Sequence, residues 1–179
     1  TRVRLGVVQP GENIADFNDA LTTLQNSLAY LYNSGDRYWY DTRPTLRKTM
    51  EDRATQVPAS EVEHAIEEKL RRLRREAPFQ GIHVCPASSQ DVPDEQTARL
   101  VVLGPADEHK GGQANSPALT AAEDILNHRG SSPRMFRNML SFVAPDQDAI
   151  ASLKQEVRRL LAWESIKNDA LSLGLDLMQ

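Results

Sequence analysis

One stretch near the C-terminus constrains the fold of this chain more than any other. The apolar run Met139–Ala144 ends at Pro145-Asp146, and a long helical pattern follows, in which apolar residues recur at helical spacing: Ile150, Leu153, Val157 and Leu160. Asp146 is suited to cap that helix, because its carboxylate can accept the free amide hydrogens of the first turn. A buried strand that runs into a capped helix is half of an α/β unit.

Two further apolar runs predict strands in the same layer. Gly81–Cys85 is short and is closed by Pro86, whereas Arg99–Leu103 is a continuous aliphatic run of the kind that parallel sheets bury on both faces. With Met139–Val143 as a third strand, and with helices before, between and after, the sequence predicts an α/β fold in which a small mixed sheet is flanked by helices.

The predicted helices around these strands are marked by their ends. Ser60 and Glu63 fit a capping box at the start of one helix. Ser116-Pro117 predicts the start of another, since proline is favoured at the first helical position. Gly130 is placed to cap the C-terminal end of that second helix.

The N-terminal part is predicted to be a helix followed by a hairpin. After a strand-like run at Val3–Val8, Asn13 is a predicted N-cap, and apolar residues follow on one helical face: Ile14, Phe17, Leu21, Leu24 and Leu28. Aromatic runs on both sides of Asn33–Asp36 predict a β-hairpin, and a polar helix is predicted over Pro44–Thr55. This winged-helix-like order predicts two domains, 1–58 and 59–179, or one continuous domain.

Composition limits the classes of function. The chain has 179 residues and a formal net charge of −4, which argues against nucleic-acid binding by its whole surface, because such binding requires neutralisation of phosphates. One cysteine allows no internal disulfide and favours a reducing, cytoplasmic location. No apolar run is long enough to span a membrane, so no membrane partner is expected. The chain enters a strand-like run directly after Thr1, which predicts a segment of a longer protein.

The predicted helix and hairpin leave two functions open. A DNA-binding wing would use Arg37 on the hairpin together with the basic residues beyond it: Arg43, Arg47 and Lys48. The helix face that would enter a groove instead holds Asp16 and Asp19, which have the wrong sign for a phosphate-lined groove. The other function is a structural hairpin packed on its helix, and we favour it.

A second basic cluster lies at the end of the helix predicted over Glu61–Glu76: Lys69, Arg71, Arg72, Arg74 and Arg75. Nucleic-acid contact is one explanation. However, an acidic start and a basic end complement the helix macrodipole, and Glu67 and Arg71 form an i, i+4 pair in the favourable order. We therefore favour a helix that neutralises its own charges.

Two side chains of reactive type alternate in a predicted strand. His83 and Cys85 point to the same face of Gly81–Cys85. A zinc site would need further ligands beside them, and the sequence identifies no base that would activate Cys85. We therefore predict no catalytic residue and no metal site.

Signals for nucleotide chemistry are incomplete. The acidic residues Asp107 and Glu108 follow a buried strand, as in a Walker B element, but they come too late, and no GxxxxGK[ST] motif occurs. Arg134 and Arg137 lie just before a predicted strand, where they are our candidates for side chains that face a phosphate in the manner of an arginine finger. The alternative, which we favour, is that they are surface charges or pair with acidic loops.

The chain resembles domain-of-unknown-function family 499, a family of large P-loop ATPases of bacteria and archaea. The resemblance lies in five blocks that cover nearly the whole chain in the expected order: Arg4–Asn13, Tyr30–Pro44, Asp91–Pro105, Ser116–Leu126 and Gly130–Ile166. Members are often encoded beside DNA methyltransferases and helicases in phage-defence islands.

The resemblance implies a phosphate-binding motif N-terminal to these residues, and this chain would be a non-catalytic accessory region that contributes interdomain packing or nucleotide sensing. ATP and Mg²⁺ are expected for the parent protein and no cofactor for this part of it. The expected partners are the remainder of the ATPase chain, and then DNA, a DNA methyltransferase or a helicase. A nucleic-acid-binding module is the alternative function.

Overall fold

The computed structural model describes residues 6–35, 37–74 and 77–174. It divides into two compact units, one of Val57–Leu161 and the other of Thr1–Gln56 with Ala162–Gln179. The two domains expected at 1–58 and 59–179 stay a prediction. Within the described residues, no helix is long and apolar enough to cross a membrane.

The Val57–Leu161 unit is built on a parallel sheet. Strands β3 (Gly81–Val84), β4 (Arg99–Val102) and β7 (Leu140–Val143) lie in the order β3-β4-β7, with both pairs parallel. All three strands were expected from the sequence to within one residue at each end. The continuous aliphatic run of β4 is explained by its central place, because a central parallel strand is covered on both faces.

The connections between these strands differ in kind. From β3 to β4 the chain makes only a 3₁₀ turn, η1 (Ser89–Asp91). From β4 to β7 it forms helix α5 (Pro117–Asn127), a small hairpin and a second 3₁₀ turn. These last elements are β5 (His128–Arg129), β6 (Ser132–Pro133) and η2 (Arg137–Met139).

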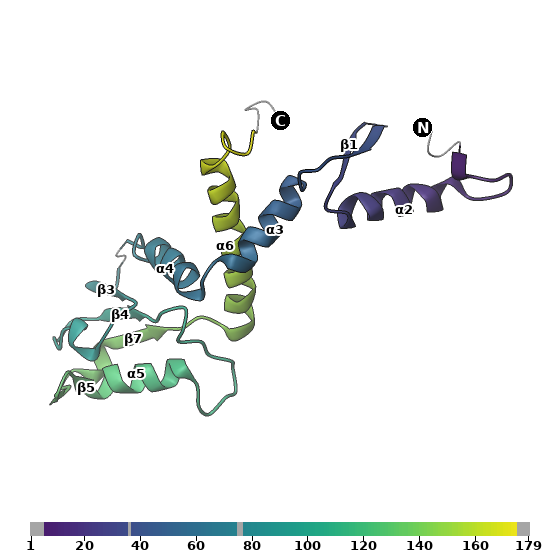
Figure 1. Ribbon diagram of the computed structural model, residues 1–179. Coiled ribbons are helices and arrows are strands. Elements are labelled where there is room, and N and C mark those ends of the chain that lie inside the picture. The colour runs from purple at the N-terminus through teal and green to yellow at the C-terminus, as the bar shows by residue number, and fades with distance from the viewer. Residues whose placement is uncertain (1–5, 36, 75–76, 175–179) are drawn as a thin grey trace. The chain divides into compact units, whose positions relative to one another are not determined.

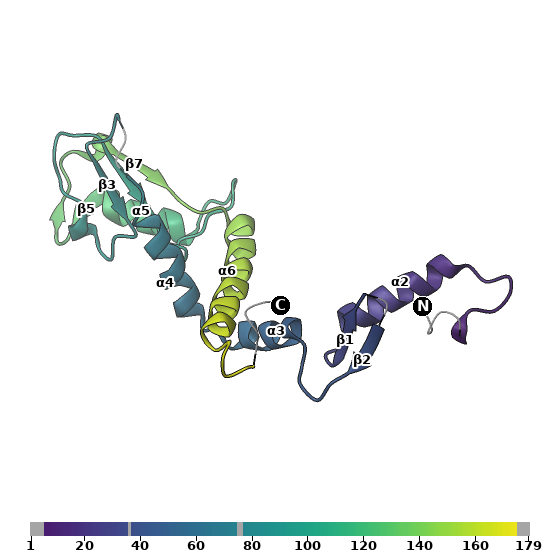
Figure 2. The ribbon, with the colours of Figure 1, turned by 90° about the horizontal axis from the view of Figure 1, so that it is seen from above.

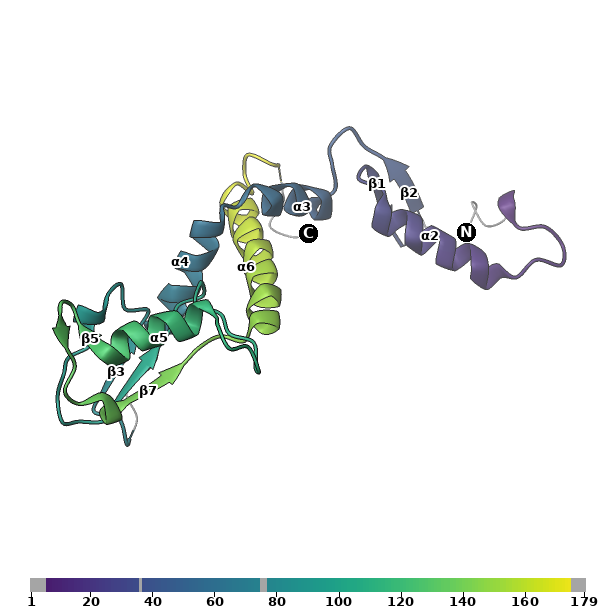
Figure 3. The same cartoon turned by 90° about the horizontal axis from the view of Figure 1, so that it is seen from below.

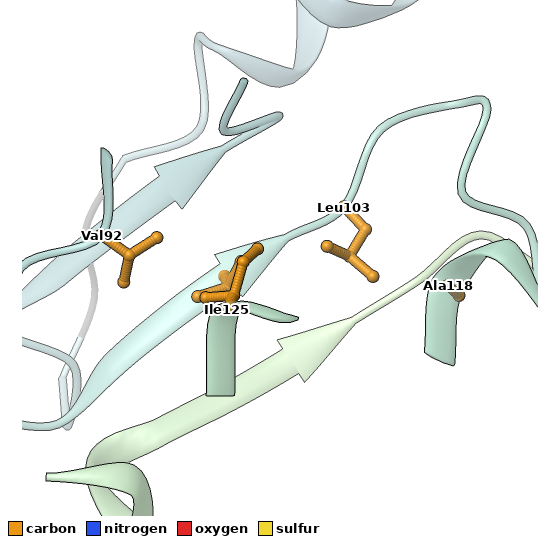
Figure 4. Close-up of a cluster of buried hydrophobic side chains, with 5 residues drawn as sticks. Val92, Leu103, Ala118 and Ile125 are labelled. Carbon is orange, nitrogen blue, oxygen red and sulfur yellow. The ribbon is translucent and has the colours of Figure 1, made fainter. Parts of the chain in front are cut away.

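Helix α5 covers one face of the sheet (Figures 1 and 3). The side chains of Val101 and Leu103 point to this face and form a buried cluster with Val92, Ala118 and Ile125. Figure 4 shows Ile125 of α5 directly against β4, with Leu103 and Val92 on either side of it. Burial of apolar surface in this cluster is the main stabilisation of the unit.

A second cluster joins the two other helices of this unit. Val62 and Ile66 of α4 (Ala59–Leu70) pack against Ile150 near the start of α6 (Gln147–Asn168). Between the same helices, Lys154 Nζ lies 2.9 Å from Glu63 Oε1. The long helix predicted from the periodicity after Asp146 is therefore confirmed, and its first turns are buried on one side.

The helix ends of the Val57–Leu161 unit confirm two predicted caps and correct two others. Asp146 Oδ1 accepts from the amide of Ala149 at 2.9 Å, and Ser116 Oγ accepts from that of Leu119 at 3.2 Å. The capping box at Ser60 is wrong, because Pro58 is the N-cap and its fixed φ lets α4 begin at Ala59.

Gly130 was expected to cap α5, but this prediction is also wrong. The helix ends at Asn127 and its C-cap is His128. Gly130 instead makes the turn between β5 and β6 with a φ of 60°. A side chain would be strained at that φ, and a Cβ there would lie 2.5 Å from Gln90 Nε2.

The other unit begins with a helix and a hairpin. Helix α2 (Ile14–Ser27) is capped by Asn13, whose side chain accepts from the amide of Ala15, as predicted. Antiparallel strands β1 (Leu31–Ser34) and β2 (Arg37–Tyr40) follow and form the predicted hairpin, and α3 (Leu46–Gln56) comes next. Figure 2 shows β1 and β2 beside the C-terminal end of α2.

The fold class predicted from the sequence is confirmed: the protein is α/β, with small sheets flanked by helices. The sheet expected to be mixed is parallel in all three of its strands. The strand expected at Val3–Val8 falls in part outside the described residues, and Gly6 and Val7 within it are helical. Helix α4 is also shorter than expected, because it ends at Leu70 and the basic residues Arg71 and Arg72 follow in a turn.

Candidate functional site

The carboxyl ends of the three parallel strands meet at one edge, which is where open α/β sheets usually bind ligands. Here the acidic side chains already have hydrogen-bond partners. Asp107 Oδ2 accepts from the amide of Gly104 at 3.2 Å, and Glu108 Oε1 accepts from Gln147 Nε2 of α6 at 3.3 Å. The Walker B-like acids thus bond to groups at this same edge of the sheet.

The two helices that start at this edge are closed to an anion. Phosphate is bound at helix N-termini through free amide hydrogens. At α5 such an amide donates to Ser116 Oγ, and at α6 the amides of Asp148 and Ala149 donate to Asp146 Oδ1. The residues at this edge therefore do not fit the phosphates of a nucleotide, and the carboxylates there would repel them.

Cys85 lies at the same edge, directly after β3, with a φ of 48°. Burial raises the pKa of its thiol above the ordinary value, and the nearby Glu67 carboxylate acts in the same direction. A thiol in this environment stays protonated at neutral pH and is a poor nucleophile. Across the described residues, no group of three or more His, Cys, Asp or Glu side chains is placed to hold a metal ion.

Arg134 and Arg137, the two arginines that were candidates to face a phosphate, differ in how far they are buried. Arg134 is 3% exposed, and its guanidinium donates to the carbonyl oxygens of Ile125 at 2.7 Å and of Val92 and Pro93 at 2.9 Å. It therefore joins the end of α5 to the loop after η1. This burial does not fit an arginine that faces a phosphate or lies on the surface, because the buried carbonyls need a donor. It fits the other part of the favoured alternative, pairing with an acidic loop, since Arg134 Nη1 lies 3.9 Å from Asp94 Oδ1.

Asp94 completes the arrangement around Arg134. Its carboxylate accepts from the amides of Met135 at 2.8 Å and Phe136 at 2.9 Å, and these hydrogen bonds lower the pKa of Asp94 below the ordinary value. Arg137 is exposed, and its Nε donates to the carbonyl oxygen of Arg134 at 3.3 Å. The two arginines do not share an anion site, and only Arg137 remains open to one.

A polar depression lies beside this arrangement. It has a volume of about 640 Å³, and it is lined by Gln90, Asp94, Arg129, Ser131, Ser132, Pro133 and Met135. Arg129 is the cation of this surface and Asp94 its anion. The mixed charge does not select a phosphate.

Arg99 and His83 form a polar contact that the sequence did not predict. Arg99 Nη1 lies 3.1 Å from His83 Nε2, and Arg99 Nη2 pairs with Glu95. A guanidinium only donates, so His83 Nε2 must accept, and the imidazole is neutral. Gly81 leaves room for this contact, because a Cβ at Gly81 would lie 2.7 Å from Arg99 Nη1.

Large apolar side chains are exposed on the helix and hairpin of the N-terminal unit. None of the residues of α2 is buried, although the helix carries the expected apolar face, and Leu24 on that face is 46% exposed. On the hairpin, Trp39 and Tyr40 are exposed as well. The sequence signal for this surface was clear, since both the helical spacing and the aromatic runs were predicted.

Three of the four basic candidates in this unit have partners. Arg47 Nε lies 3.1 Å from Glu51 Oε1, and Lys48 Nζ lies 2.7 Å from Asp52 Oδ1. Arg43 Nη1 donates to the carbonyl oxygen of Leu173 at 3.4 Å. Arg37 is exposed on the hairpin. Pairing with carboxylates leaves Arg47 and Lys48 less suited to a nucleic acid than Arg37.

A pocket of about 380 Å³ lies between the end of α2, β1 and the start of α3. Its walls combine apolar side chains, such as Leu28, Leu31 and Leu46, with the paired Arg47 and Lys48. Because these charges already have partners, the pocket offers mainly apolar surface to a second molecule.

We predict that Arg134 is required for stability. Arg134→Met keeps the side-chain volume but leaves buried carbonyls without donors, which should lower the free energy of unfolding by about 2–5 kcal/mol. Arg137→Met, on the exposed arginine, should change it by less than about 0.5 kcal/mol. Urea unfolding of both variants measures this, and equal effects would contradict the structural role of Arg134.

We also predict a pH dependence that originates at His83. Burial lowers the pKa of His83 below its ordinary value, and the Arg99 guanidinium acts in the same direction. The unfolded chain therefore binds the proton more readily. The stability that His83 contributes is present above a pH of about 6.5 and decreases as the pH falls below that value.

His83→Gln is the matched control, because glutamine can still accept from Arg99 but does not titrate. The free energy of unfolding should fall more steeply in the wild type than in this variant between about pH 7 and about pH 5. Parallel profiles in the two proteins would show that His83 does not couple to folding.

No family model, curated protein or solved structure matches this chain.

Proposed function

We propose that this chain is a non-catalytic accessory region of a large P-loop ATPase that acts in DNA modification or phage defence, where it packs against other parts of the ATPase chain. The resemblance of its sequence blocks to that ATPase family supports the proposal. On this proposal ATP and Mg²⁺ bind elsewhere in the parent chain, and the protein works in the cytoplasm.

The uncovered apolar face of α2 is the observation that carries the packing role. An isolated helix of 14 residues is marginally stable in water, so a helix of this length depends on the surface that it buries. The 11-residue α5 buries Ala118 and Ile125 against the sheet, whereas α2 buries none of its residues. A covering partner on the α2 face supplies the missing burial.

Packing is better supported than nucleotide sensing. A direct sensor of nucleotide needs free donors or a cation aimed at phosphate. At the carboxyl edge of the sheet the helix N-termini are capped by Ser116 and Asp146, and Arg134 is buried among carbonyls. Arg137 is the exposed arginine of that pair, and we retain it as the candidate through which a sensing role would act.

One observation favours the alternative, a nucleic-acid-binding module. The hairpin presents exposed aromatic side chains next to the exposed Arg37. Arg47 and Lys48 are paired with carboxylates, so Arg37 is the basic residue that this alternative depends on. DNA, or a helicase or methyltransferase that holds DNA, would be the partner in that case.

We predict that Leu24→Asn distinguishes the packing role. In this chain the substitution should change the free energy of unfolding by less than about 0.5 kcal/mol, since Leu24 is uncovered. In the longer ATPase chain the same amide would be buried without a partner, which should cost about 1–3 kcal/mol. Thermal unfolding of both chains measures the difference.

Thr23→Asn is the control for this experiment. It introduces the same side chain one residue earlier, where Thr23 is exposed, and it should be neutral in both chains. If Leu24→Asn were equally mild in the long and the short chain, the α2 face would not be a packing surface.

A further inference from the structure

The β1–β2 hairpin has two different faces. Tyr32 pairs with Trp39 and Ser34 with Arg37 across the hairpin, and directly opposite residues of antiparallel strands lie on the same face. These four residues therefore form one face, which we call the stacking face. Because side chains alternate along a strand, the other face holds Leu31, Asn33, Tyr38 and Tyr40.

Helix α2 contacts the other face along β1. Leu31 is 8% exposed, and Gln25 Nε2 of α2 donates to Asn33 Oδ1 at 2.7 Å. Both contacts lie on the face opposite Trp39. The C-terminal end of α2 lies beside the hairpin in Figure 2.

Tyr32 and Trp39 are held in a fixed arrangement. Their ring centroids are 5.9 Å apart with an angle of 19° between the planes, and the Tyr32 hydroxyl donates to the carbonyl oxygens of Pro44 at 2.9 Å and Arg43 at 3.3 Å. The anchored Tyr32 fixes the indole, which is still 43% exposed. An exposed, pre-oriented indole loses little entropy when a flat ligand stacks on it.

A cation lies on the same face. Arg37 is exposed and is two residues from Trp39 on β2, so the two side chains project from the same stacking face. A cation beside an aromatic platform is the combination by which proteins hold single-stranded nucleic acid: the base stacks on the ring and the phosphate pairs with the cation.

We propose that the stacking face binds single-stranded nucleic acid, with one base stacked on Trp39 and an adjacent phosphate paired with Arg37. The inference rests on the nucleic-acid-binding function named as the alternative above. It specifies a single strand, because bases in a duplex are stacked on each other and have no free face. The acidic Asp16 and Asp19 of α2 also argue against insertion of this helix into a groove.

Quenching of tryptophan fluorescence tests the stacking directly. The chain has two tryptophans, so Trp163→Phe leaves Trp39 as the reporter. An oligothymidylate of about a dozen nucleotides should quench the fluorescence of Trp39. An abasic oligomer of equal length and a duplex should bind at least about ten-fold more weakly. Arg37→Ala should lower the slope of log affinity against log salt concentration by about one.

The matched pair of variants is Trp39→Leu and Tyr40→Leu. Both remove an aromatic ring from β2, but Tyr40 is on the opposite face and is 74% exposed. Trp39→Leu should weaken binding of a dye-labelled oligothymidylate about ten-fold or more by anisotropy, and Tyr40→Leu should not. Circular dichroism checks that both variants are folded, and Arg37→Ala tests the same face without removing a packed ring.

The outcomes separate the inference from the function on which it rests. If the abasic oligomer or the duplex bound as well as oligothymidylate, or if Tyr40→Leu had the same effect as Trp39→Leu, nucleic-acid binding would stand and the stacking face would be excluded as its site. If no nucleic acid bound at low salt, both the inference and the nucleic-acid-binding function would be overturned.

Discussion

The pairing of β4 on both of its edges is the constraint on which the Val57–Leu161 unit depends. This strand lies between β3 and β7, and Val101 at its centre has no exposed surface. Its apolar side chains require α5 on one face of the sheet, and α5 in turn requires a long return to β7. Buried Arg134, on this return, donates to the carbonyl of Ile125 in α5 and to those of Val92 and Pro93 in the connection between β3 and β4. The buried Arg134 and the acidic side chains at the carboxyl edge of the sheet therefore find their partners within the unit.

The helix and hairpin of the N-terminal unit have the opposite property. Their backbone is well defined by the Asn13 cap and the hairpin register, but their apolar side chains are left largely uncovered. Local hydrogen bonding can specify such elements without supplying the burial that stabilises them. We therefore place function on this surface: α2 offers an apolar face for packing, and the hairpin offers an anchored indole beside a cation.

The sequence predicted what depends on local pattern. Aliphatic runs gave the three strands, Asn13 and Asp146 gave two helix starts, and the aromatic runs gave the hairpin. It did not predict contacts between residues that lie far apart along the chain. The residues around Arg134 in the sequence do not indicate that its guanidinium donates hydrogen bonds to the carbonyl oxygens of Val92 and Pro93. The predicted capping box at Ser60 was wrong, because Pro58 is the N-cap and the fixed φ of its ring lets the helix begin earlier. The contact between Arg99 and His83 was not predicted, because it forms only when β3 and β4 pair.

Hydrogen exchange of this chain, resolved by residue, tests the central contrast most directly. Amides of β4 should exchange only through global unfolding, because both of its edges are paired. Amides of α2 should exchange at close to the rate of an isolated helix, because none of its residues is buried among the described parts of the chain. Protection of α2 equal to that of β4 would contradict the account, since it would show that α2 is already stabilised within this chain and has no need of a partner.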